Sequence, residues 1–256
     1  MRTLSTMWPF ADVAPLPLAF VALALFGASI VRGYSGFGFS MLAISSMTLV
    51  LPPAEVVPIV LLLEISASIH MLPGVWRHID WRSLWPLMVG NAVGTPIGIY
   101  FLISLPAQPL RVGISLLVIA AATLLWRGFA LQTMPSRSTA TGIGVSAGVL
   151  NGSIGIGGPP VVLFYLSSPA GAAMTRASLV AYFFGTDSVT LAMMATQGLF
   201  TTEVVVRTIA LLPLLIGGIV IGSRRFIKTE PTTFRRFTLI VLIGLSIAGL
   251  VRAYYL

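Results

Sequence analysis

Charged residues are scarce in this sequence: Asp, Glu, Lys and Arg make up 9% of its 256 residues, whereas hydrophobic residues make up 57%. A soluble globular domain carries about 25% charged residues, because its surface must face water. Three stretches contain no charged residue at all: 13–31, 83–110 and 138–175. Since about 20 apolar residues let a helix cross a bilayer, the sequence predicts an all-α integral membrane protein.

Cysteine is absent, which excludes disulfides and thiolate metal sites, and we expect neither a metal nor a cofactor. The chain also lacks the G-x-x-x-x-G-K-[ST] loop that holds nucleotide phosphates, so ATP is not expected to drive its activity directly. The net charge of +8 is placed mostly between apolar segments, as in the loops that orient membrane helices. We therefore expect the lipid bilayer, and not nucleic acid, as a partner.

Ten apolar segments occupy the chain and fall into two series of five. The first series lies near 13–33, 39–51, 54–73, 83–103 and 108–126, and the second near 138–152, 158–168, 172–197, 204–222 and 236–255. The second member of each series is short for a membrane span and follows a glycine-rich turn. This pattern predicts two repeats, 1–127 and 138–256, within a single membrane domain.

The two repeats also match in sequence: Gly36-Phe-Gly38 corresponds to Gly155-Ile-Gly157, and Glu64 corresponds to Asp187. Basic loop residues follow the third segment of the first repeat but the fourth segment of the second. This exchange predicts 8–10 membrane segments in two inverted, pseudo-symmetric halves, each with a broken or re-entrant helix pair at its glycine-rich turn. The segments expected to face the cytoplasm are 74–82, 127–137 and 223–235.

The two glycine-rich turns, 33–38 and 152–158, indicate a binding site for a small anion. Glycines allow a helix to break inside the membrane, and the freed N–H groups of the next half-helix attract negative charge. Arg32 directly precedes the first turn, and its planar guanidinium suits a sulfonate or carboxylate. The predicted substrate-binding residues are Arg32, Ser35, Gly36, Gly38, Ser40, Asn151, Ser153, Gly155, Gly157 and Gly158. The competing interpretation is that the glycines only permit close helix packing and that Arg32 reaches the membrane interface.

Glu64 and Asp187 lie inside apolar segments at matched positions. A charge in mid-bilayer costs several kcal/mol, so such residues usually have a function or a partner. A carboxylate there can hold a proton, and we predict that these two residues couple transport to protons. The structural alternative is an ion pair, for instance with Arg32 or Arg176.

Two further glycine series are spaced every four residues, at 90, 94 and 98 and at 144, 148 and 152. This spacing puts each series on one face of a helix, and we interpret both as seams where helices pack closely.

The motifs Ser35-Gly-Phe-Gly38 and Asn151-Gly-Ser-Ile-Gly-Ile-Gly-Gly-Pro-Pro160 resemble the paired glycine motifs of the sulfite exporter TauE/SafE family. The resemblance covers nearly the whole chain. It implies a secondary transporter in the cell inner (cytoplasmic) membrane that carries sulfite or an organosulfonate such as sulfoacetate. Direction of transport and the exact anion stay open, as does a homodimeric assembly.

Two other functions are open to the sequence. One is an anion channel. The other is a rhomboid-like intramembrane serine protease, because Gly33-Tyr-Ser-Gly36 resembles the GxSG motif and His70 is available as a base. The protease interpretation leaves the second glycine motif and the duplication unexplained, so we expect a transporter and not an enzyme.

Overall fold

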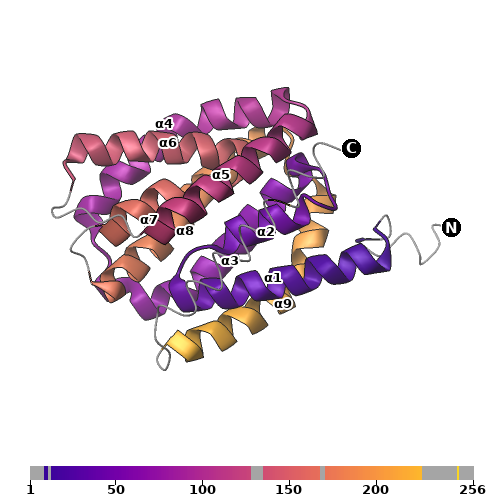
Figure 1. Ribbon diagram of the computed structural model, residues 1–256, viewed down its shortest axis with the longest axis horizontal. Coiled ribbons are helices and arrows are strands. Elements are labelled where there is room, and N and C mark those ends of the chain that lie inside the picture. The colour runs from indigo at the N-terminus through magenta and orange to yellow at the C-terminus, as the bar shows by residue number, and fades with distance from the viewer. Residues whose placement is uncertain (1–8, 11–12, 128–134, 168–170, 227–246, 248–256) are drawn as a thin grey trace.

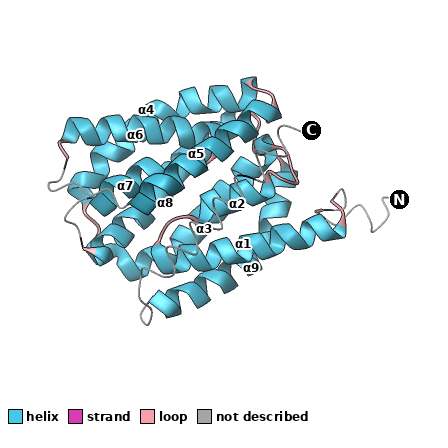
Figure 2. Cartoon of the chain, viewed as in Figure 1, coloured by secondary structure: helices cyan, strands magenta, loops and turns pink. Residues whose placement is uncertain are grey.

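The computed structural model describes residues 9–10, 13–127, 135–167, 171–226 and 247 (Figure 1). These residues form nine α-helices and one 3-10 turn, without a strand (Figure 2). The helices are α1 Pro15–Ser35, α2 Phe39–Met47, α3 Pro53–Val75, α4 Trp81–Ser104, α5 Ala107–Arg127, α6 Arg137–Ile154, α7 Gly158–Ser167, α8 Ala172–Thr196 and α9 Thr202–Phe226; the 3-10 turn is η2 Trp76–His78. Nine of the ten predicted segments are thus helices, and the tenth, 236–255, lies outside the described residues apart from residue 247.

Five of the described helices are long and apolar enough to cross a membrane: α1, α3, α4, α8 and α9. The predicted all-α membrane fold is therefore confirmed. The helices α2 and α7, which follow the glycine-rich turns, have only 9 and 10 residues. At 1.5 Å per residue neither spans the roughly 30 Å hydrocarbon layer by itself.

The helix starts follow from local sequence. Prolines occupy the first turn of α1 and α3, where a missing N–H has no intrahelical partner to lose. Asp80 caps α4 by accepting the Arg82 backbone N–H at 3.2 Å, and Ser136 caps α6 by accepting that of Thr139 at 3.2 Å. Both capped helices therefore begin at defined residues.

Two helix pairs form the outer layers of the bundle: α4 packs along α6, and α1 packs along α9 (Figure 1). The predicted glycine seams are confirmed in the first pair. A methyl group built on Gly94 would lie 2.1 Å from the carbonyl oxygen of Val145, and one on Gly148 would lie 2.2 Å from that of Asn91. The backbones therefore touch directly, which lets polar groups of facing helices come close without large side chains between them.

We expect Gly94→Ala to destabilise the protein by roughly 1–3 kcal/mol, because the new methyl group meets rigid backbone. The matched control is Gly142→Ala on α6, where a methyl group has nothing within 4 Å. Thermal unfolding of the purified variants in one detergent measures the difference. Equal melting temperatures for the two variants would show that the seam is looser than described.

The two ends of the bundle differ in charge. The helices α4 and α6 begin at the left end of Figure 1, where α9 ends, and the exposed residues Arg77, Arg82 and Arg137 gather there. At the opposite end, the buried Arg207 forms ion pairs with Glu55 at 2.9 Å and Glu203 at 2.6 Å. One end is therefore basic, and the other holds paired charges.

Candidate functional site

The first glycine-rich turn ends α1 and begins α2. Gly36 is the C-cap of α1 with φ 79°, and Gly38 is the N-cap of α2 with φ 87°. Both values lie in the left-handed region, which a residue with a side chain rarely adopts. Glycine is therefore required here to break the helix, as the sequence predicts.

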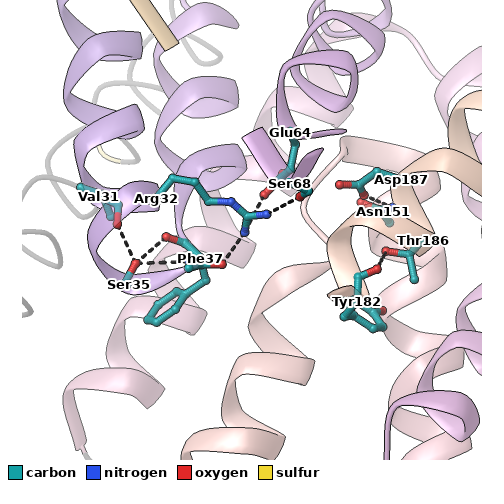
Figure 3. Close-up of polar contacts among 11 residues, drawn as sticks. Val31, Arg32, Ser35, Phe37, Glu64, Ser68, Asn151, Tyr182, Thr186 and Asp187 are labelled. Atoms are coloured by element: carbon teal, nitrogen blue, oxygen red, sulfur yellow. Dashed lines mark hydrogen bonds and ion pairs between the residues drawn. The ribbon is translucent and has the colours of Figure 1, made fainter. Parts of the chain in front are cut away.

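Arg32 lies one helical turn before this break and is fully buried. Its guanidinium donates Nη1 to the carbonyl of Gly36 and Nη2 to the hydroxyl of Ser68 at 2.8 Å (Figure 3). Nη1 also lies 3.3 Å from Oε1 of Glu64 on α3. On its other side the guanidinium stacks over the ring of Phe183 on α8, 4.7 Å from the ring centroid. The side chain therefore turns inward to neighbouring helices, and an interfacial role for Arg32 is wrong.

The second glycine-rich turn is built in the same way. Gly155 is the C-cap of α6 with φ 68°. One turn earlier, Asn151 donates Nδ2 to Oδ1 of Asp187 on α8 at 3.0 Å and to the hydroxyl of Thr190 at 3.1 Å. Asn151 and Asp187 are both buried. The second turn thus places the amide of Asn151, on α6, against the carboxylate of Asp187, on α8.

The two halves place different residues at equivalent positions. Arg32 precedes Gly36 by four residues, and Asn151 precedes Gly155 by four residues. The partners are Glu64 in the first half and Asp187 in the second, which are the carboxylates that match in sequence. Arg32 also interacts electrostatically with Asp187, so the two pairs form one cluster between α1, α3, α6 and α8. We call Arg32, Glu64, Asn151 and Asp187 the central cluster.

The remaining predicted residues mostly build the turns. Ser35 contacts the carbonyls of Val31 and Phe37, each at 2.8 Å, and Ser153 donates to the carbonyl of Val149 at 2.7 Å. Ser40 is buried on α2 and contributes a side-chain hydrogen bond to Glu64. In the second turn, Gly157 packs on Asn151.

Of the other glycines, Gly158 lies against its own half of the protein, whereas Gly155 and Gly36 lie against the opposite half. A methyl group on Gly158 would lie 3.2 Å from the ring of Phe183. A methyl group on Gly155 would lie 2.6 Å from Ile44 of α2, and one on Gly36 would lie 2.9 Å from Cγ of Arg176 on α8. Each turn is therefore covered by helices of the other half.

Three residues near the central cluster were not predicted as site residues: Ser68, Phe183 and Arg176. Ser68 stands four residues after Glu64 and so shares its face of α3, which the sequence does reveal. Phe183 and Arg176 come from α8 and reach α1 only through tertiary packing. Arg176 donates Nη2 to the carbonyl of Gly33 at 2.8 Å and is partly exposed, whereas Arg32 is not. It therefore places a second positive charge between the first turn and the basic end.

The central cluster holds one guanidinium and two carboxylates. Buried polar atoms are normally hydrogen-bonded, yet Nε of Arg32, Oε1 of Glu64 and Oδ2 of Asp187 have no hydrogen-bond partner among the described residues. Oε1 of Glu64 still takes part in the ion pair with Nη1 of Arg32, whereas no such contact is found for Nε of Arg32 or Oδ2 of Asp187 in the described part of the chain.

Comparison with known proteins decides the family: residues 21–249 match the model of the family described as "Sulfite exporter TauE/SafE". This chain belongs to the TauE/SafE family. It is 27% identical over 240 residues to a Cupriavidus necator protein named "Probable sulfite/organosulfonate exporter TauE", with 90% of this chain and 93% of that protein covered. It is 28% identical to the Comamonas testosteroni "Probable inner membrane transporter protein TsaS", with 74% and 81% covered. No solved structure matches it.

Membership of the TauE/SafE family makes the protein a membrane transporter and not an enzyme. The protease interpretation is therefore wrong. The structure gives a physical reason, since the hydroxyl of Ser35, the would-be nucleophile, is engaged with the carbonyls of its own turn.

Proposed function

We propose that this TauE/SafE protein is a secondary transporter that carries a small sulfur-containing anion, sulfite or an organosulfonate such as sulfoacetate, across the inner membrane with protons. The observation that carries the proposal is the buried Arg32, which forms an ion pair with the buried Glu64 and interacts electrostatically with Asp187. The names of the two relatives, a probable sulfite/organosulfonate exporter and a probable inner membrane transporter, support the substrate class and the location in the membrane.

Arg32 is suited to bind the anion. Its Nη atoms contact Gly36, Ser68 and Glu64, which fixes the plane of the guanidinium, while Nε has no hydrogen-bond partner among the residues that the structure describes. A guanidinium presents donors in a fork that matches two oxygens of a sulfonate or carboxylate. An arriving anion then competes with Glu64 for the same positive charge.

Proton coupling follows from the charge balance. With both carboxylates ionised, the cluster has one positive and two negative charges, and an anion would add a third negative charge in a place shielded from water. Burying unpaired charge costs several kcal/mol. Protonation of Glu64 and Asp187 as the anion binds removes this penalty, so anion and protons move together.

The helix pairing supports two inverted halves. In the first pair, α1 is the first helix of the first half and α9 is the fourth helix of the second half. In the second pair, α6 is the first helix of the second half and α4 is the fourth helix of the first half. The third helices, α3 and α8, pack on each other between these pairs. Rocking of one half against the other would open the central cluster to each side in turn. By the positive-inside rule, the basic end is the cytoplasmic end.

The proposal is tested with the purified protein in sealed liposomes. We expect sulfite or sulfoacetate to accumulate against its own gradient when a proton gradient is imposed, by about tenfold per pH unit for each proton carried, when the protons balance the charge of the anion. A channel would only equalise the concentrations. Equal rates for chloride and acetate would contradict the sulfur-anion specificity.

A further inference from the structure

The start of α4 and the start of α6 lie side by side at the basic end and enclose two adjoining cavities. The first, of about 340 Å³, is lined by Asp80, Arg82, Ser136 and Arg137 among others. The second, of about 400 Å³, shares Arg82 and Arg137 and continues to Trp85 and Val89. The two arginines thus line both cavities, at the point where they adjoin.

Neither guanidinium has a side-chain partner in the part of the protein that the structure describes. The side chains of Arg82 and Arg137 form no ion pair and no hydrogen bond in the described part of the chain. Asp80, the carboxylate of the first cavity, caps α4 through the backbone N–H of Arg82. Two positive charges against one negative charge leave the hollow positive, and the N-termini of two parallel helices add to this potential.

The second cavity continues from the two arginines onto an exposed apolar strip of α4. Trp85, Val89, Val93 and Ile97 follow one another every four residues on α4 and are 50–60% exposed. This strip runs beside the glycine seam with α6, so its side chains face the acyl chains of lipids. The two arginines therefore lie at the membrane surface, and the apolar strip of α4 extends from them into the hydrocarbon layer.

We propose that Arg82 and Arg137 bind the phosphodiester headgroup of an anionic phospholipid of the cytoplasmic leaflet, whose acyl chain lies along the Trp85 strip of α4. The headgroup supplies the negative charge that the two arginines lack, and basic pockets between membrane helices on the cytoplasmic side are known to bind such lipids. The site is separate from the central cluster and does not depend on the transported anion.

Native mass spectrometry of the full-length protein with equal amounts of phosphatidylglycerol and phosphatidylcholine of the same acyl chains tests the proposal. We expect retained adducts of phosphatidylglycerol. In the double variant Arg82→Gln, Arg137→Gln its binding should be roughly 30-fold weaker, because each arginine near the surface contributes roughly five- to sixfold.

The matched control is the double variant Arg77→Gln, Arg224→Gln, which removes the same charge from exposed residues outside both cavities. It should keep wild-type binding. Equal loss in both double variants, or equal binding of the two lipids to the wild-type protein, would overturn the proposal. The lipid preference of the wild type decides the matter even if a variant does not fold. Displacement of the lipid by millimolar sulfoacetate would instead show a site for soluble anions, which also contradicts it.

Discussion

Removing the charge of Arg32 is expected to abolish transport. Its guanidinium is the positive group of the central cluster, and charge-assisted hydrogen bonds contribute about 1.5–3 kcal/mol each. Loss of two such bonds to an anion corresponds to roughly 100-fold or more in affinity. Uptake of labelled substrate into liposomes that contain Arg32→Ala measures the effect. Near-normal transport would remove Arg32 from the binding site.

A simple loss of folding must be separated from this result. Arg32→Ala leaves Glu64 buried without its partner, and breaking a buried pair from one side costs about 3–5 kcal/mol. The double variant Arg32→Gln, Glu64→Gln removes both charges together, and we expect it to stay folded but inactive. Arg207→Gln serves as the control, because Arg207 is an equally buried arginine at the opposite end of the bundle. Its folded fraction should transport normally.

Neutralising Asp187 is expected to uncouple transport from protons. The substitution Asp187→Asn keeps an oxygen that accepts the Asn151 hydrogen bond, so the local geometry is preserved while the ionisable group is lost. The wild type should accumulate its anion about tenfold per pH unit for each proton carried, whereas the variant should only equilibrate it. Transport rates measured between pH 5 and pH 8 should accordingly lose their slope in the variant.

Glu64→Gln provides the second arm of this experiment, because Glu64 occupies the equivalent position in the first half. Glu203→Gln, an exposed carboxylate outside the central cluster, is the control and should keep the wild-type pH profile. If both Asp187→Asn and Glu64→Gln keep the wild-type profile, neither carboxylate carries the coupling proton, and the pairs are structural only.

Much of the fold was predictable because a bilayer allows few solutions. Nine of the ten apolar segments are helices, and the glycine series at 90, 94 and 98 does form a seam with α6. The break at Gly36 was also predictable, since glycine-rich sequence before a short apolar segment favours a helix end. These features depend on residues close together in the chain.

The candidate site was predicted only in part. Arg32, Asn151, Glu64 and Asp187 were named from their positions, and the structure brings them together. Ser35 and Ser153 are used within their own helices or turns, which cannot be read from the presence of a hydroxyl alone. Phe183 was not named, and Arg176 was considered only as an ion-pair partner of the carboxylates, because an apolar helix containing one arginine does not reveal which helix it will pack against.

The sequence by itself determined that the chain forms apolar helices in a membrane, where two of them break, and which family it belongs to, because each depends on local composition or motif. Tertiary structure alone decided that Arg32 pairs with Glu64, that Asn151 pairs with Asp187, and that these pairs share one cluster. The physical reason is that a charge in the low-dielectric interior is stable only beside an opposite charge or a hydrogen-bonding group. These partners come from helices that are far apart in the chain, and only the packing of the helices determines which of them lie close together.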